Sequence, residues 1–138
     1  FSIKSNLSSY FQFLLAIRGE FVGCFVIKKE LGIDLEELSI EEFERFDFKR
    51  GKVYIDFKHW RYSSYGANTI TNKILNKLDE VEGKKAIVIN IFDENEMDKI
   101  IESNRIIEIP ALLENDGFHA NPEAINKIRM CLEDCKND

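Results

Sequence analysis

Hydrophobic positions along the chain switch between helical spacing and strand-like spacing. In some stretches apolar residues recur every three or four positions, which is typical of a helix with one buried face. In others they are β-branched and either alternate with polar residues or run together, which is typical of strands. The pattern predicts helices at 8–32, 67–80, 93–103 and 121–135, a short turn at 35–45, a strand pair within 44–60, and strands at 84–92 and 105–113. This order predicts an α/β domain with a central mixed sheet flanked by helices.

Residues at the predicted element ends support several of these boundaries. Gly32 is a natural C-terminal cap for the first helix, and Ser39 is a natural N-cap for the short acidic turn. Asn121 is an N-cap followed by Pro122 at the first position of the closing helix. Pro110 has no backbone N–H for a sheet ladder, so its strand should end or bulge there and lie at an edge.

Length and composition indicate one globular domain that spans residues 1–138. The 138 residues are 44% hydrophobic and 32% charged, so a single core is expected. No apolar run approaches the ~20 residues that a membrane span needs. Cys24, Cys131 and Cys135 form no disulfide framework and lack the partners of a zinc site, which favours a reducing, cytosolic compartment. Because the chain opens on Phe1 without an initiator methionine, we expect a piece of a longer protein.

The most strand-like segment carries charged residues where apolar ones are expected. A turn at Arg50–Gly51 predicts a β-hairpin whose side chains alternate between two faces. The core face then holds Phe46, Phe48, Val53, Ile55 and Phe57, and the other face holds Asp47, Tyr54, Asp56 and Lys58. In this register Asp47 and Asp56 are diagonal neighbours about 7 Å apart at Cα.

Two carboxylates that close repel each other, and each raises the other's pKa unless a cation is present. Hard oxygen ligands of this kind suit Mg²⁺ or Mn²⁺. The alternative is an exposed surface on which Asp47 pairs with Arg45 or Lys49 and Asp56 pairs with Lys58. The otherwise apolar strand around Asp56 favours the metal.

A third carboxylate, Glu20, lies inside the apolar stripe of the first helix. The stripe residues are Phe13, Ile17, Glu20, Cys24, Ile27 and Leu31. A buried carboxylate without a partner is expensive. Gly19 and Gly23 flank it at helix-interior positions where glycine costs about 1 kcal/mol against alanine, so we expect the sheet or a substrate backbone to approach closely. The alternative is that Glu20 pairs with Arg18 or Lys28 at the rim of the stripe.

Charge is distributed unevenly along the chain, whose formal net charge is −6. From Arg45 to Arg61 six basic residues stand against two aspartates, which gives a local charge of +4. Such a basic strip on an acidic body can follow a phosphate backbone. A solvated hairpin with ordinary surface lysines is the alternative explanation.

Together these residues resemble the PD-(D/E)XK nuclease superfamily, whose restriction-endonuclease-like core is αβββαβ. The resemblance covers residues 10–92 and rests on "GEFVG" around Glu20, "FDF" around Asp47 and "YIDFKHW" around Asp56 and Lys58. It implies that the three carboxylates are catalytic residues and ligands of Mg²⁺ or Mn²⁺. It also implies that Lys58 activates the attacking water and that the carbonyl of Phe57 is a possible further ligand.

The chain departs from this family at three points. Phe46 replaces the proline that precedes the first hairpin aspartate, and position 56 is Asp where Glu is commoner. Only two strands are predicted before the second helix, where the family core has three. Residues 93–138 would add a C-terminal strand and helix to the core.

The activity implied by the resemblance is that of a Mg²⁺-dependent endonuclease that hydrolyses phosphodiester bonds of DNA. Arg61, Trp60 and Lys73 are the candidate substrate-binding residues. By analogy the domain would be a toxin or effector part of a larger bacterial protein, acting in the cytoplasm and bound by a cognate inhibitor. The alternatives are a nuclease-fold module that binds nucleic acid or protein without cutting, and a structural domain whose acidic pair is an accident of the surface.

Overall fold

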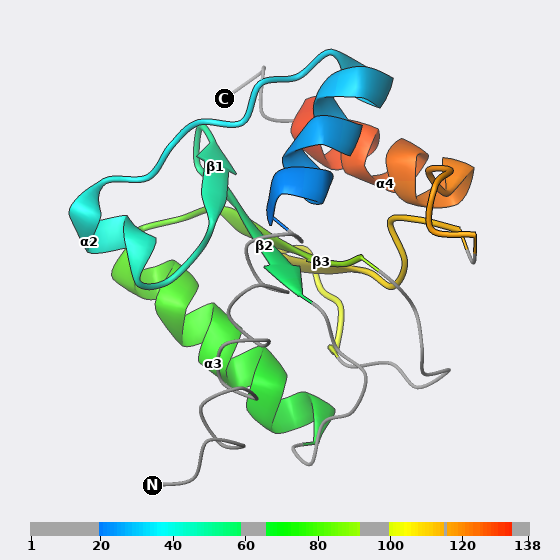
Figure 1. The fold of residues 1–138 in the computed structure, drawn as a ribbon. Helices are drawn as coiled ribbons and strands as arrows, with labels where there is room; N and C mark the ends of the chain where they lie inside the picture. The colour runs from blue at the N-terminus through cyan, green and yellow to red at the C-terminus, as the bar shows by residue number, and fades with distance from the viewer. Residues whose placement is uncertain (1–19, 59–65, 92–99, 115, 134–138) are drawn as a thin grey trace, which may run out of the picture.

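The computed structural model describes residues 20–58, 66–91, 100–114 and 116–133 (Figure 1). A helix over residues 20–31 comes first. The elements after it are α2 (Ile40–Phe43), β1 (Phe48–Arg50), β2 (Val53–Lys58), α3 (Ala67–Glu80), β3 (Lys85–Asn90), β4 (Ile106–Ile109) and α4 (Pro122–Glu133). Residues 93–99 of the predicted short helix lie outside the described ranges, and residues 100–103 are not helical.

The strands form one mixed sheet in the order β1-β2-β3-β4. β1 and β2 are antiparallel, whereas β2, β3 and β4 are parallel to one another. β4 ends at Ile109 and lies at a sheet edge, as Pro110 predicted. The α/β class and the mixed sheet flanked by helices are therefore confirmed.

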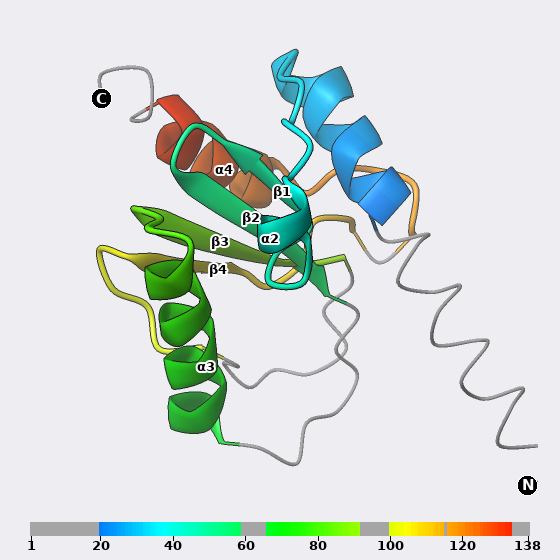
Figure 2. The same cartoon turned by 90° about the vertical axis from the view of Figure 1, so that its left-hand side faces the viewer.

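Helices cover both faces of the sheet, as the side view in Figure 2 shows. The helix over 20–31 and α4 pack on one face in a core that includes Ile27, Ile55 and Ile128. α3 packs on the other face through residues such as Leu78. Because both faces are covered, β3 is a continuous apolar run, and Ala86 to Ile89 are fully buried.

The hairpin register differs from the prediction by two residues. Gly51 and Lys52 form the turn, and Phe48 faces Ile55 where Val53 was expected. The cause is the turn itself: Gly51 has a φ of 60° and takes the first central position of a two-residue turn, where a positive φ favours glycine. Asp47 lies one residue before β1, where its backbone N–H bonds to Ile55 O at 3.1 Å and its carboxyl group contacts that of Asp56. The two aspartates are closer neighbours than the predicted diagonal pair.

The predicted hairpin faces are incorrect at one aromatic residue, Phe46, whereas Tyr54 lies on the face opposite Val53, Ile55 and Phe57 as predicted. Phe46 and Tyr54 share the core beneath α3, with ring centroids 5.1 Å apart. Phe46 lies before β1, where strand alternation does not apply, and its backbone N–H bonds to Glu42 O instead. The second face of β2 is thus covered, and Asp56 lies on that covered face.

The helix over 20–31 lies very close to the sheet. A Cβ on Gly23 would lie 2.2 Å from the ring of Phe57, so only glycine allows this approach. The expectation of a close contact at this glycine is confirmed, and the contacting element is the sheet. Gly32, with a φ of 68°, ends the helix as predicted. No helix among the described residues is long and apolar enough to cross a membrane.

Candidate metal-binding active site

Asp56 is a buried carboxyl group in the interior of the sheet. It is 5% exposed, and its Oδ2 lies 3.0 Å from Nζ of Lys58 two residues further along β2. Burial raises the pKa of Asp56 to about 7; the Lys58 ammonium opposes this shift, and the nearby Asp47 charge adds to it. The pairing of Asp56 with Lys58 was foreseen as the alternative to a metal; Asp56 is buried, whereas the Lys58 side chain is 31% exposed.

Asp47 reaches Asp56 from the opposite strand of the hairpin. Its Oδ2 accepts a hydrogen bond of 2.8 Å from the backbone N–H of Phe57, and its carboxyl group is hydrogen-bonded to that of Asp56. Burial raises the pKa of Asp47, while the bonds to Asp56 and Phe57 N–H lower it and the Glu20 charge raises it. Two carboxyl groups in direct contact need a shared proton or a cation. The hairpin therefore provides a place where a cation is favoured.

Glu20 contacts Asp47 from the helix over 20–31. It is half-buried, and its carboxyl group lies within hydrogen-bonding reach of Asp47. It does not pair with Lys28, whose Nζ lies 2.8 Å from Asp34 instead. Arg18, the other partner considered, lies outside the described residues. Burial raises the pKa of the Cys24 thiol to about 11, and the nearby Glu20 and Asp47 charges add to this shift.

Asp47 lies between the other two carboxylates, and the three do not form one tight cluster. Among the described residues, the group of three ligand side chains whose donor atoms all lie within 4.8 Å of one another is Glu114, Asp116 and His119, in the exposed loop before α4. Asp116 already accepts hydrogen bonds from two backbone N–H groups of that loop. The loop carboxylate therefore stabilises its own turn, and the predicted set is a pair, Asp47 and Asp56, with Glu20 beside it.

The donor atoms around this pair fit a hard divalent cation. Carboxylate oxygens are the ligands that Mg²⁺ and Mn²⁺ prefer. A main-chain oxygen is also available: Lys58 O accepts from Ile91 N, just after β3, so the alternation of strand carbonyls turns Phe57 O toward the Asp47 side of β2. The described residues thus offer Asp47, Asp56 and Phe57 O as a ligand set, with Glu20 adjacent.

Sequence reasoning missed two buried polar residues on the same face of the sheet. Asn90 ends β3 in register with Lys58, and Glu108 on β4 lies two strands from Asp56 in a row through Val88. Both are 6% exposed. The only signal in the sequence is one polar residue at the end of the first apolar run and one within the second, and the parallel register that groups them is not evident from it.

The predicted substrate-binding residues are only partly described. Lys73 is exposed on α3, whereas Trp60 and Arg61 lie outside the described residues. No family model matches the chain, and no curated protein matches it either.

Proposed function

We propose that this chain is a metal-dependent nuclease that hydrolyses phosphodiester bonds of DNA. The observation that carries the proposal is the contact between the Asp47 and Asp56 carboxyl groups, with the Lys58 ammonium 3.0 Å from Asp56. A buried acidic pair with a lysine two residues further along the strand is unfavourable for folding. Such a pair is useful in an active site, where it can bind a metal ion beside the phosphate that reacts. The finer αβββαβ arrangement of the restriction endonucleases belongs to this proposal.

In this proposal the carboxylates of Asp47 and Asp56 hold Mg²⁺ or Mn²⁺, with Phe57 O and Glu20 as further oxygen donors. A bound metal ion polarises the phosphate and lowers the pKa of a coordinated water. The backbone N–H of Phe57 fixes Asp47 in place through its 2.8 Å hydrogen bond. Asp56 is fixed by its burial within β2, so little rearrangement is needed when the ion binds.

Lys58 supplies positive charge where the phosphate reacts. Its side chain is 31% exposed, so the ammonium is held by Asp56 yet remains open to solvent and to a substrate. A positioned ammonium stabilises the charge that develops on the phosphate and orients the attacking water. Lys58 is not a metal ligand, because an ammonium has no lone pair.

A plasmid-cleavage assay in Mg²⁺, Mn²⁺ and EDTA tests the proposal. The wild-type protein should cut supercoiled DNA with either metal and not with EDTA. Lys58→Ala should reduce the cleavage rate by about 10²–10³ while leaving the metal-binding isotherm close to wild type. Lys52→Ala is the matched control, because Lys52 lies exposed at the turn of the same hairpin. Cleavage by Lys58→Ala at the wild-type rate would remove the role assigned to this residue.

A second candidate function is a nuclease-fold module that binds nucleic acid without cutting it. Two observations favour it: the Lys58 ammonium is engaged by Asp56, and the three carboxylates are not drawn into one cluster. Intact plasmid in both metals, together with DNA binding in a gel-shift assay, would support this function over hydrolysis.

A further inference from the structure

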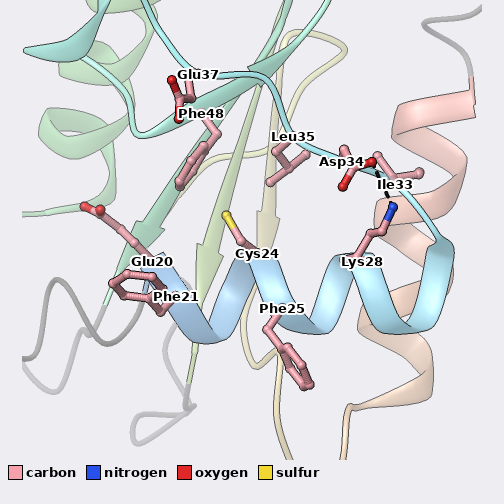
Figure 3. A pocket seen from close by; sticks show the side chains of 10 residues that line it. All are labelled: Glu20, Phe21, Cys24, Phe25, Lys28, Ile33, Asp34, Leu35, Glu37 and Phe48. Atoms are coloured by element: carbon pink, nitrogen blue, oxygen red, sulfur yellow. Dashed lines mark hydrogen bonds and ion pairs between the residues drawn. The ribbon is translucent and has the colours of Figure 1, made fainter.

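A groove of about 530 Å³ begins at Glu20 and runs along the helix over 20–31. Figure 3 shows its walls: the helix on one side, and the segment over 33–37 with β1 on the other. Its volume lies in the about 300–1,000 Å³ range of small-molecule sites. Because Glu20 lies at one end of it, an occupant of this groove would lie beside the proposed metal ligands.

The groove has a largely apolar lining with an aromatic ring at its mouth. Phe48, Leu35 and Cys24 line its interior (Figure 3). Phe21, next to Glu20 in the chain, is 74% exposed. An aromatic side chain left largely in water beside a candidate catalytic centre provides a flat surface on which another ring can stack.

Charge restricts what can enter this groove. Glu20, Asp34 and Glu37 line it, and Lys28, the cation among its described lining residues, is paired with Asp34 at 2.8 Å. Carboxylates repel a phosphodiester backbone, but they accept hydrogen bonds from amino groups. The groove therefore suits a flat, largely apolar ring that carries N–H donors and no negative charge.

We propose that this groove binds a nucleobase of the strand being cut, unstacked from its neighbours, while the adjacent phosphate lies at Asp47, Asp56 and Lys58. This inference rests on the proposed nuclease function and deepens it. A base would stack on Phe21, as unpaired bases do on aromatic side chains in other proteins. The amino group of cytosine, adenine or guanine would donate to a groove carboxylate. The preferred substrate is then single-stranded DNA, or duplex DNA with an unpaired nucleotide.

The test measures base binding separately from cleavage. A single-stranded oligonucleotide that contains 2-aminopurine is titrated with protein in Ca²⁺, and the same sequence is titrated as a duplex. Stacking should quench the fluorescence of the single strand and leave that of the duplex largely unchanged. Phe21→Ala should weaken binding of the single strand about ten-fold. Phe43→Ala should leave it unchanged, because Phe43 is 72% exposed on α2 and does not line the groove.

Cleavage of the same two substrates is then measured in Mg²⁺. Wild type should cut the single strand at least ten-fold faster, and Phe21→Ala should lose most of this preference. If the protein cleaves DNA but Phe21→Ala changes neither base binding nor the preference for the single strand, the groove assignment is overturned and the proposed nuclease function stands. Quenching that depends on Phe21 without any cleavage would overturn the nuclease and support the base site. Binding of a cationic Lys-Trp-Lys peptide that depends on Phe21, with no binding of the oligonucleotide, would identify a protein-docking groove and overturn the inference.

Discussion

At the scale of single residues, Asp56 is the most unusual feature of the molecule. It occupies an interior position of a strand that is buried on both faces, and Lys58 compensates it only in part. An isosteric neutral residue would fold more easily there. A carboxyl group at a buried strand position is costly for folding, and this is the pattern expected where a residue serves chemistry and not stability.

Asp56→Asn should therefore stabilise the metal-free protein, and the gain should depend on pH. The folded-state pKa of Asp56 is about 7, above its ordinary value of about 3.9. A raised carboxyl pKa makes the folded state bind the extra proton, so wild-type stability falls as pH rises from about 4 to about 7. Above pH 7 the penalty is complete and should be on the order of 2–4 kcal/mol.

Urea denaturation of both proteins in EDTA, at pH 5 and at pH 8, measures this difference. The advantage of Asp56→Asn in the free energy of unfolding should be larger at pH 8. An advantage that is equal at both pH values would mean that Asp56 titrates like a surface carboxylate, which is contrary to its burial. Asp34→Asn, at an exposed aspartate paired with Lys28, is a control in which little pH dependence is expected.

At the scale of elements, the position of Glu20 depends on how closely its helix approaches the sheet. Gly23 lies about one helical turn after Glu20, and its lack of a side chain lets the Phe57 ring pack against the helix backbone. Gly23→Ala would gain about 1 kcal/mol of helix propensity. It would also force apart two packed elements, and overpacking of this kind costs about 1–3 kcal/mol or more. We expect a net loss of stability and a displaced Glu20.

A double-mutant cycle tests this explanation. Gly23→Ala alone should lower the free energy of unfolding, and Phe57→Leu alone should lower it by removing ring contacts. The two together should cost less than their sum, because the smaller side chain leaves room for the new methyl group. Strict additivity in urea denaturation would show that the two residues do not constrain each other.

Most elements and the antiparallel hairpin could be predicted from the sequence, but the hairpin register and the parallel pairing of the strands could not. Caps at Ser39 and Asn121 gave correct starts for α2 and α4, and their side chains accept the hydrogen bonds expected of N-caps. Asp47, Asp56 and Lys58 were expected to be neighbours because side-chain alternation is local. The two-residue error in register arose because a glycine fits either central position of a tight turn. Asn90 lies beside Lys58, and Glu108 lies beside Val88, only because β2, β3 and β4 pair in parallel. These strands are distant in the sequence, and local pattern gives no signal for their pairing.

At the scale of the whole molecule, the candidate site joins parts that are otherwise held together only by packing. Glu20 comes from a helix on one face of the sheet, Asp47 from the start of the hairpin and Asp56 from a central strand that also faces α3. A cation bound by these groups would link the helix over 20–31 to both strands of the hairpin. Metal binding should therefore stabilise the fold as a whole and not one loop.

Mg²⁺ should raise the melting temperature at pH 8 and have a smaller effect at pH 5.5, because Asp56 must lose its proton before it binds a metal. At ten times Kd the stabilisation is about 1.4 kcal/mol, which corresponds to roughly 3–6 °C for a domain of this size. Asp47→Asn should abolish the shift, whereas His119→Ala should retain it, because His119 belongs to the separate exposed cluster before α4. Thermal melts in Mg²⁺ and in EDTA make the comparison. A shift that survives Asp47→Asn and disappears in His119→Ala would place the ion in the exposed loop and remove the metal from the proposed active site.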